Sequence, residues 1–274
     1  MNKILNLLVG RYPFRFILAK ILIGLKLSKF FKIKMNDGYF INFVDSALSI
    51  SYFVNKSERY TDVILLKDML RHGNVVVDIG ANIGTVTLPA SKFVGNKGKV
   101  YSFEPHPKTF TFLQENVKSN KLDNIELFCL GCGNKHEILK FTSLRGDDQN
   151  KISEQGNIEI KVVTLDSVLT DNVDLLKIDT EGWELNVLQG SLNLLKNTKA
   201  VFIEFNTSNN ILNGIESKEI IKLLYENSFS LFTIDVIKKE IYKFEFYEDV
   251  SYRIYILALK YVDEFVKITN YKVL

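Results

Sequence analysis

The stretch that most constrains this chain is NVVVDIGANIG, residues 74–84, where an apolar run ends in an aspartate followed by two glycines. The uninterrupted apolar residues 75–77 predict a buried parallel strand, and the turn after it predicts the start of a helix. Gly80 and Gly84 carry no Cβ, so the backbone can approach a ligand closely, and free N–H groups at a helix start favour an electron-rich partner. The stretch is typical of a nucleotide-type site.

The glycine spacing narrows the class of nucleotide. Dinucleotide-binding proteins use G-x-G-x-x-G, whereas Asn82 stands here at the second glycine position and disfavours close approach of a pyrophosphate. The Asp78 carboxylate repels phosphate and attracts the ammonium of an amino-acid moiety. A glycine turn that only packs a strand on a helix is the alternative at this point.

The segments after the turn alternate between helix and strand. Residues 99–103 form the next predicted strand, which ends in Glu104, and residues 124–130 form a third strand that closes at Gly131 and Cys132. An acid about 20 residues beyond the glycine turn stands where α/β nucleotide folds hold two ribose hydroxyls. The order predicts an α/β fold with a parallel sheet and right-handed crossovers.

Further acids follow the later strands. The predicted strand 174–178 ends in Asp179, Glu181 and Glu184, and the predicted strand 199–205 carries Glu204 near its end. All of them fall at the sheet edge that holds the glycine turn, where ligands bind in such folds. Glu184 fits equally well as a partner of the following helix dipole. Two late strands, 229–234 and 252–259, suggest an antiparallel last strand.

Between these segments, residues 135–163 interrupt the alternation. They contain two predicted strands, 138–141 and 158–163, and the polar segment between them carries Arg145, Asp147 and Asp148. A polar insertion of this length is typical either of a lid or substrate loop or of a solvated hairpin tip.

The N-terminal arm differs in charge from the rest of the chain. Residues 1–36 hold eight basic residues and no acid, whereas the other 27 of the 35 basic residues accompany 32 acidic ones. The acidic remainder argues against a nucleic-acid partner, which would need clustered Lys and Arg. We divide the chain into an N-terminal helical and hairpin extension, residues 1–56, and an α/β domain, residues 57–274.

Residues 14–31 of the arm are apolar nearly all round a helical wheel, but charges interrupt them too often for a membrane span, and no signal-peptide cleavage site is evident. Such a helix needs cover, either from this chain or a second subunit in a homodimer, or from peripheral contact of residues 1–34 with a membrane. We expect a cytoplasmic protein, at the inner face of the membrane if the arm binds lipid.

Cys129 and Cys132 form C-x-x-C with His136 nearby. A second Cys or His pair at zinc-site spacing is missing from the sequence, so we interpret the cysteines as reduced, small residues near the end of a buried strand.

Four motifs in this order resemble the FkbM family of S-adenosylmethionine-dependent methyltransferases, across about residues 58–206. They are VVVDIGANIG, VYSFEPHP, VTLD at residues 163–166, and LLKIDTEGWE with VFIEFN behind it. The resemblance implies the Rossmann-like class I fold, with a seven-stranded, mostly parallel sheet and an antiparallel last strand. Family members resemble enzymes that methylate hydroxyls, frequently on sugars of surface polysaccharides or glycosylated metabolites.

The resemblance also implies positions for the cofactor, S-adenosylmethionine. Residues expected to hold its methionine part are Asp78, Gly80, Asn82 and Gly84. Glu104 is expected to hold the ribose, and Gly131 and Cys132 the adenine. Cys132 departs from the acidic or polar side chain that methyltransferases often have there.

For catalysis the sequence offers four groups near one sheet edge, Asp179, Glu181, Glu204 and His106. A sugar hydroxyl is a poor nucleophile, so a base that accepts its proton assists methyl transfer. Alternatively, the three carboxylates ligate Mg²⁺, which prefers oxygen ligands, and the metal orients a glycan or small-molecule acceptor. We favour Glu181 or Asp179 as the base or orienting group, with Glu204 in support.

Two other functions compete with this interpretation. A nicotinamide-dependent oxidoreductase shares the glycine turn and the ribose acid but needs a third glycine that Asn82 and Ile83 do not supply. A catalytically silent, membrane-associated binding protein is the second, against which the retained acids count.

Overall fold

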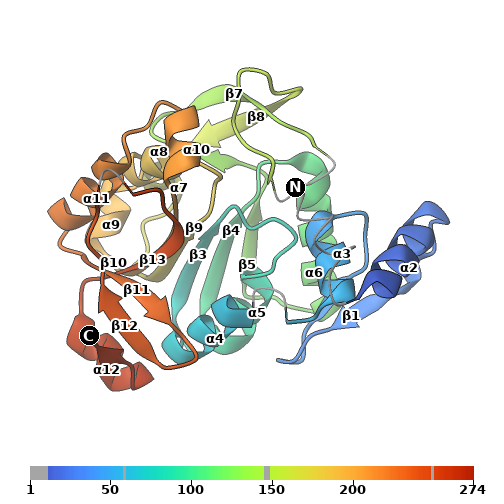
Figure 1. Cartoon of the computed structure of the whole chain (residues 1–274), viewed down its shortest axis with the longest axis horizontal. Coiled ribbons are helices and arrows are strands. Elements are labelled where there is room, and N and C mark those ends of the chain that lie inside the picture. Colours follow the sequence, from blue (N-terminus) through green and yellow to red (C-terminus); the bar gives the residue numbers. More distant parts are fainter. Residues whose placement is uncertain (1–11, 58–59, 145–148, 248–249) are drawn as a thin grey trace.

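A computed structural model describes residues 12–57, 60–144, 149–247 and 250–274 of the chain. Its centre is a nine-stranded sheet in the order β5-β4-β3-β9-β10-β13-β11-β12-β14 (Figure 1). The strands, in chain order, are β3 Val75–Ile79, β4 Lys99–Phe103, β5 Ile125–Phe128, β9 Val173–Ile178, β10 Thr198–Asn206, β11 Ser230–Asp235, β12 Glu240–Lys243, β13 Arg253–Leu259 and β14 Lys272–Val273.

The sheet confirms the predicted fold and extends it. Strands β5, β4, β3, β9 and β10 are parallel, and β13 runs antiparallel to both of its neighbours, β10 and β11. These strands and β11 make up the expected seven. Strand β12 adds to the edge as a hairpin with β11, and β14 then pairs with β12. The carboxyl ends of β3, β4, β9 and β10 therefore meet at one edge.

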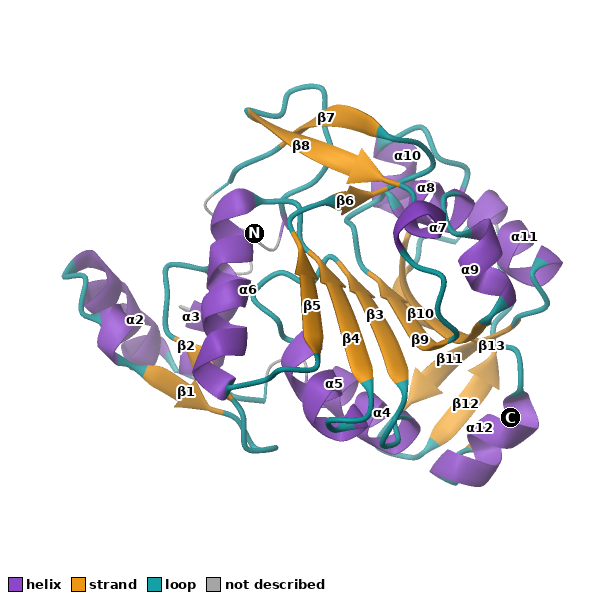
Figure 2. Cartoon of the chain, turned by 180° about the vertical axis from the view of Figure 1, so that it is seen from behind, coloured by secondary structure: helices purple, strands orange, loops and turns teal. Residues whose placement is uncertain are grey.

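Helices cover both faces of the sheet (Figure 2). One face packs against α4 Tyr60–Met69, α5 Thr87–Val94 and α12 Val262–Thr269. The other packs against α8 Glu184–Gln189, α9 Leu192–Lys196 and α11 Ser217–Glu226. Val76 belongs to the first core and Val77 to the second, because successive side chains of a strand point to opposite faces. This double burial explains why residues 75–77 of β3 are apolar without interruption.

The N-terminal segments form a third apolar cluster beside α6 Pro107–Asn120. They are α2 Pro13–Gly24, the β1 Lys32–Lys34 and β2 Phe40–Asn42 hairpin, and α3 Ala47–Val54. The predicted hairpin is confirmed. The apolar segment 14–31 is a shorter helix than predicted, because the chain turns through a left-handed residue at Lys26 and continues as a 3₁₀ helix, Ser28–Phe30. In the described part of the chain, no helix is long and apolar enough to cross a bilayer.

Two asparagines of α6 join the hairpin to the rest of the molecule. The buried Asn116 accepts a hydrogen bond from the Asn42 N–H at 2.7 Å and donates to the Ile83 carbonyl at 2.8 Å. Asn120 accepts from the Phe40 N–H and donates to the Phe40 carbonyl, both at 2.7 Å. Helix α6 thereby fixes β2 against the loop that follows Gly80.

A small three-stranded sheet lies over the carboxyl ends of the main strands (Figure 2). It consists of β6 Gly131–Cys132, β7 Glu137–Phe141 and β8 Ile158–Val163, which confirms both strands predicted in the insertion. Phe141, Ile160 and Val162 form its own buried cluster. The polar residues Arg145, Asp147 and Asp148, on which the lid prediction depends, lie outside the described residues.

Replacing Asn116 with alanine is expected to lower the free energy of unfolding by about 2 to 4 kcal/mol, since the Asn42 N–H and the Ile83 carbonyl both lose their partner. Urea unfolding followed by circular dichroism measures this as a lower midpoint at an unchanged slope. Gln114→Ala, at an exposed position of the same helix, is the control and should change stability by less than about 0.5 kcal/mol. Equal midpoints for the two variants would contradict the anchoring role of Asn116.

Candidate active site

The glycine turn after β3 touches the segment that follows β9. Gly80 has a φ of +74°, and a Cβ there would collide with the backbone carbonyl oxygen of Asp179. A Cβ on Gly84, at φ +95°, would lie 2.9 Å from Leu113 of α6. Gly80 is therefore required for close approach of two strand ends, and Gly84 for close packing of a helix on the turn.

Glu104 is held at the end of β4 by the backbone on both sides. One carboxylate oxygen accepts the Asn82 N–H at 2.9 Å, and the other accepts the His106 N–H at 2.9 Å. The side chain is 5% exposed and lines the pocket described below. Carboxylate oxygens are hydrogen-bond acceptors, so a Glu104 positioned in this way suits two vicinal hydroxyls as donors.

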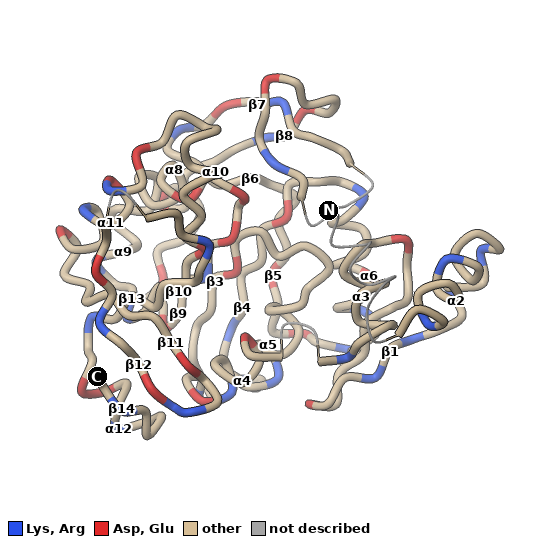
Figure 3. Tube along the Cα trace, viewed as in Figure 1, with Lys and Arg blue, Asp and Glu red and all other residues tan. Residues whose placement is uncertain are grey.

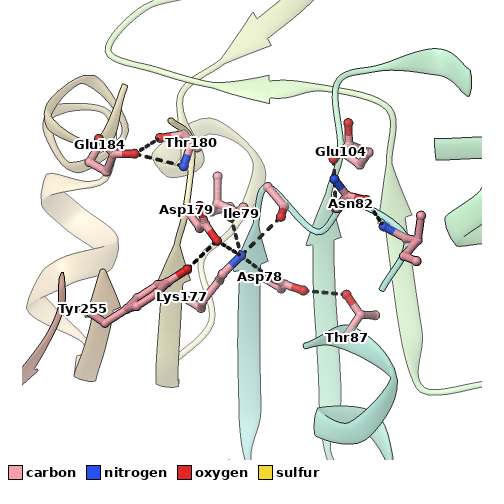
Figure 4. A network of polar contacts seen from close by, with 12 residues as sticks. Asp78, Ile79, Asn82, Thr87, Glu104, Lys177, Asp179, Thr180, Glu184 and Tyr255 are labelled. Carbon is pink, nitrogen blue, oxygen red and sulfur yellow. Dashed lines mark hydrogen bonds and ion pairs between the residues drawn. The ribbon is translucent and has the colours of Figure 1, made fainter. Parts of the chain in front are cut away.

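A buried lysine lies between the ends of β3 and β9 (Figure 4). The Lys177 Nζ is 3.3 Å from the Asp78 carboxylate and 3.6 Å from that of Asp179, and it donates to the Gly80 carbonyl at 3.2 Å. Thr87 donates to Asp78 at 2.6 Å. Tyr255 of β13 donates to Asp179 at 2.7 Å. Each buried charge thus has an opposite charge or a donor beside it, which burial of ions requires.

Asp78 is fully buried in this network and is not among the described residues that line the pocket. Its contacts with Lys177 and Thr87 place it beneath the glycine turn. Direct contact of Asp78 with the methionine part of the cofactor stays a prediction.

Asp179, Glu181 and Glu204 form an acid cluster, with one carboxylate oxygen of each lying within 4.8 Å of the others. Burial, followed by repulsion from Asp179 and Glu184, raises the pKa of Glu181 to about 7. Burial, followed by repulsion from Asp179, Glu181 and Glu184, raises the pKa of Glu204 to about 9. Near neutral pH, Glu204 holds its proton and Glu181 titrates.

Backbone geometry directs Glu181 toward the cluster. Glu181 has a φ of +54° and Gly182 a φ of +98°, so two consecutive residues are left-handed. Asn209, in α10 Thr207–Leu212, donates to the Glu181 carboxylate at 2.9 Å, and Asn213 donates to the Gly182 carbonyl at 2.9 Å. Left-handed non-glycine residues carry strain and concentrate at functional sites.

Glu184 accepts hydrogen bonds from the turn that precedes α8. One of its oxygens accepts the N–H groups of Thr180 and Gly182 and the Thr180 hydroxyl, at 2.9 to 3.1 Å. Burial raises its pKa, and the same hydrogen bonds oppose that shift. These hydrogen bonds hold the turn that precedes α8, and Glu184 is not among the described residues that line the pocket.

A pocket of about 730 Å³ lies over this edge of the sheet. It is lined by Gly80 and Asn82 of the glycine turn, by Glu104, and by residues 179–181 and Trp183, whereas Gly84 is not among the described lining residues. Leu48 of α3 and the small sheet add apolar side chains. Gly131 and Cys132 line it as well.

The structure also places His106 and Cys132, two residues that the sequence predicted for the site. His106 caps α6 by accepting the Thr109 N–H, and its Nε2 lies 2.9 Å from the Ser143 hydroxyl. Burial, followed by repulsion from Lys108, lowers its pKa. His106 is not among the described residues lining the pocket. Cys132 is buried, which raises the pKa of its thiol, so it presents a neutral surface.

Sequence reasoning missed Lys177, Trp183 and the apolar wall residues Phe141, Ile152 and Ile160. The lysine inside the apolar sequence LLKID is itself a signal. A strand that is covered on both faces of the sheet buries such a lysine, and a buried charge needs partners. The wall residues are spread over the insertion, and no local pattern assigns them to the pocket.

Comparison with known proteins agrees with this geometry. A model of the methyltransferase FkbM domain matches residues 78–231, more than half of the chain. The chain belongs to the FkbM methyltransferase family. It is therefore a methyltransferase that uses S-adenosylmethionine, as the motifs predicted, and not the alternative oxidoreductase.

Similar proteins include the hexuronic acid methyltransferase AglP of Haloferax volcanii, 28% identical over 70% of this chain and 79% of that protein. The 2-O-methyltransferase NoeI of Sinorhizobium fredii is 25% identical over 48% of this chain and 63% of its own length. The crystal structure of methyltransferase FkbM from Methylobacillus flagellatus aligns at 15% identity over 77% of this chain with a TM-score of 0.46. The alignment spans about half, 52%, of that longer chain.

The buried ion network leads to a stability prediction. Lys177→Met leaves Asp78 buried without its cation, so the free energy of unfolding should fall by about 3 to 5 kcal/mol. Adding Asp78→Asn removes the unpaired charge and should recover part of the loss. Urea unfolding of both variants measures the difference.

Lys199→Met is the matched control, because the Lys199 side chain is 49% exposed and pairs with Asp174 at 3.0 Å. An exposed pair contributes about 1 kcal/mol or less. The network account is contradicted if Lys177→Met is no more destabilising than this control.

Proposed function

We propose that this enzyme transfers a methyl group to a hydroxyl of a sugar, in a surface glycan or a glycosylated metabolite. The observation that carries the proposal is the acid cluster of Asp179, Glu181 and Glu204 beside the pocket, in which burial and the neighbouring acids raise the pKa of Glu181. The similarity to AglP and NoeI, whose names state hexuronic acid methylation and 2-O-methylation, supports an oxygen acceptor on a sugar.

We assign the cofactor to the glycine-turn side of the pocket. Glu104 would hold the ribose hydroxyls, and the backbone of Gly80, Asn82 and Gly84 would surround the methionine part. Asp78 would act from beneath the turn. The small-sheet residues Gly131 and Cys132 would lie against the adenine, where a neutral thiol offers an apolar surface. When bound, S-adenosylmethionine supplies a methyl group already activated as a sulfonium.

We assign proton transfer to Glu181. Its carboxylate accepts the proton of the acceptor hydroxyl as the oxygen takes the methyl group, which leaves a neutral ether. Asp179, fixed by Lys177 and Tyr255, would orient the hydroxyl. Glu204, protonated near neutral pH, would donate a hydrogen bond within the cluster. The pKa of His106 is lowered, and its ring already contacts Ser143 and the start of α6, so we propose only a supporting role for it.

Trp183 adds a surface for a sugar. It is the single tryptophan of the chain and lines the pocket beside Glu181. Within the described ranges, its buried indole N–H has no hydrogen-bond partner. An aromatic face with a polar edge suits a ligand that presents both C–H and O–H groups.

The same three carboxylates fit the alternative of a divalent cation, since all are oxygen ligands. Chelation separates the two mechanisms. Activity that EDTA abolishes and Mg²⁺ restores would reassign Asp179, Glu181 and Glu204 as ligands, whereas activity that EDTA leaves unchanged supports Glu181 as the base.

Glu104→Ala should weaken binding of both S-adenosylmethionine and S-adenosylhomocysteine by about 10- to 100-fold, the cost of a charged hydrogen-bond partner. Isothermal titration calorimetry measures both affinities. Glu126→Ala is the control, since Glu126 is 49% exposed on the neighbouring strand β5. Affinities equal to those of the control would refute the ribose assignment.

Glu181→Gln should lower turnover by about 100-fold or more while cofactor affinity changes little, because the proposed work is done on the acceptor. The wild-type rate should rise with pH through about 7, since a base acts only after losing its own proton, and the variant should lack this rise. Glu216→Gln, at a 65% exposed carboxyl, is the control. A wild-type rate and pH profile in Glu181→Gln would remove Glu181 from the mechanism.

A further inference from the structure

Helix α2 exposes an apolar ridge on the side away from the protein. Phe16 and Ala19 face inward and are at most 5% exposed. The ridge consists of Phe14, Ile17, Leu18, Ile21 and Leu25, which are 85%, 49%, 47%, 51% and 64% exposed. Their spacing of three or four residues places them along one face of the helix, opposite the buried one. Helix α2 thus has a second apolar face that no described residue covers.

The ridge continues beyond the helix. Leu27, Phe30 and Phe31 are 41%, 73% and 46% exposed. With Tyr12, residues 12–31 hold nine of the twenty-two exposed large apolar side chains of the described residues. Singly exposed apolar residues are normal, but a contiguous group marks an interaction surface.

Basic side chains surround the ridge. Arg15 and Lys20 lie on either side of it on the helical wheel, and Lys26, Lys29, Lys32 and Lys34 follow. Residues 12–36 contain no acid. Figure 3 shows these Lys and Arg positions along α2 and β1, at one extremity of the molecule.

We propose that this surface, the α2 ridge with its six basic residues, binds the face of an anionic lipid bilayer. The apolar side chains enter the boundary between headgroups and acyl chains, while the lysines and Arg15 remain among the anionic headgroups. Each cation near such a surface adds attraction that salt weakens.

Charge distinguishes this partner from a second copy of the chain. Two copies meeting through the ridge would bring two sets of six cations together with no acid from the same segment. Like charges across an interface are unfavourable, whereas an anionic bilayer complements them. The surface therefore fits lipid better than itself, and this proposal does not depend on the acceptor.

Co-sedimentation of the full chain with vesicles tests the proposal. Vesicles of phosphatidylcholine with about 40% phosphatidylglycerol should bind the protein, and vesicles of phosphatidylcholine alone should bind it about tenfold less. Binding should fall as sodium chloride rises from about 0.1 to 0.5 M. Phe14→Ser/Ile21→Ser should weaken binding about tenfold or more, with unchanged circular dichroism because both positions are exposed.

The apolar and the basic residues of this surface are each tested against a control variant with the same kind of substitution elsewhere in the chain. Ile138→Ser/Ile237→Ser alters side chains that are 63% and 75% exposed outside the ridge, and should bind like the wild type. Lys26→Gln/Lys29→Gln should weaken binding about tenfold, whereas Lys135→Gln/Lys222→Gln, with the same loss of net charge, should change it little.

Three results would overturn the proposal: no binding to anionic vesicles, equal loss in the ridge and control variants, or a wild-type dimer that Phe14→Ser/Ile21→Ser dissociates in the absence of any vesicle binding. The last result, from sedimentation velocity, would assign the ridge to a homodimer interface.

Discussion

The site depends on one buried ammonium group. Lys177 is 4% exposed and lies between the carboxylates of Asp78 and Asp179, which end the neighbouring strands β3 and β9. Two buried carboxylates this close would repel each other, and a buried lysine alone would be costly to desolvate. Together they compensate, and the lysine also holds a carbonyl of the glycine turn. One interaction thus sets the distance between the turn and the acid cluster.

That arrangement separates two electrostatic environments in one pocket. On the glycine-turn side, Glu104 is held by backbone N–H groups and presents fixed acceptors. On the other side, the partly buried Glu181 and the buried Glu204 lie close to each other and to Asp179, which raises both pKa values. A site with one carboxyl that is protonated near neutral pH and one that titrates there can both donate and accept a proton at an acceptor hydroxyl.

Much of the fold and of the candidate site was predictable from the sequence, because the signals are local. The run of valines before Gly80 predicts a strand that is buried on both faces. Pro105 predicts the end of the next strand, which Glu104 directly follows. The insertion could be divided into strands, but which of its side chains face the pocket depends on pairing across the small sheet. Strands β12 and β14 were not predicted, because each is short and pairs only through tertiary contacts. The sequence contains Lys177 within an apolar strand but does not show its partners, because Asp78 is distant in the chain and reaches Lys177 only through the pairing of β3 with β9.

The most direct test of the account is a crystal structure with S-adenosylhomocysteine. We expect both ribose hydroxyls to lie within hydrogen-bond distance of Glu104 and the sulfur to face the cluster of Asp179, Glu181 and Glu204. A cofactor whose ribose lies away from Glu104, or whose sulfur is directed away from these acids, would contradict it.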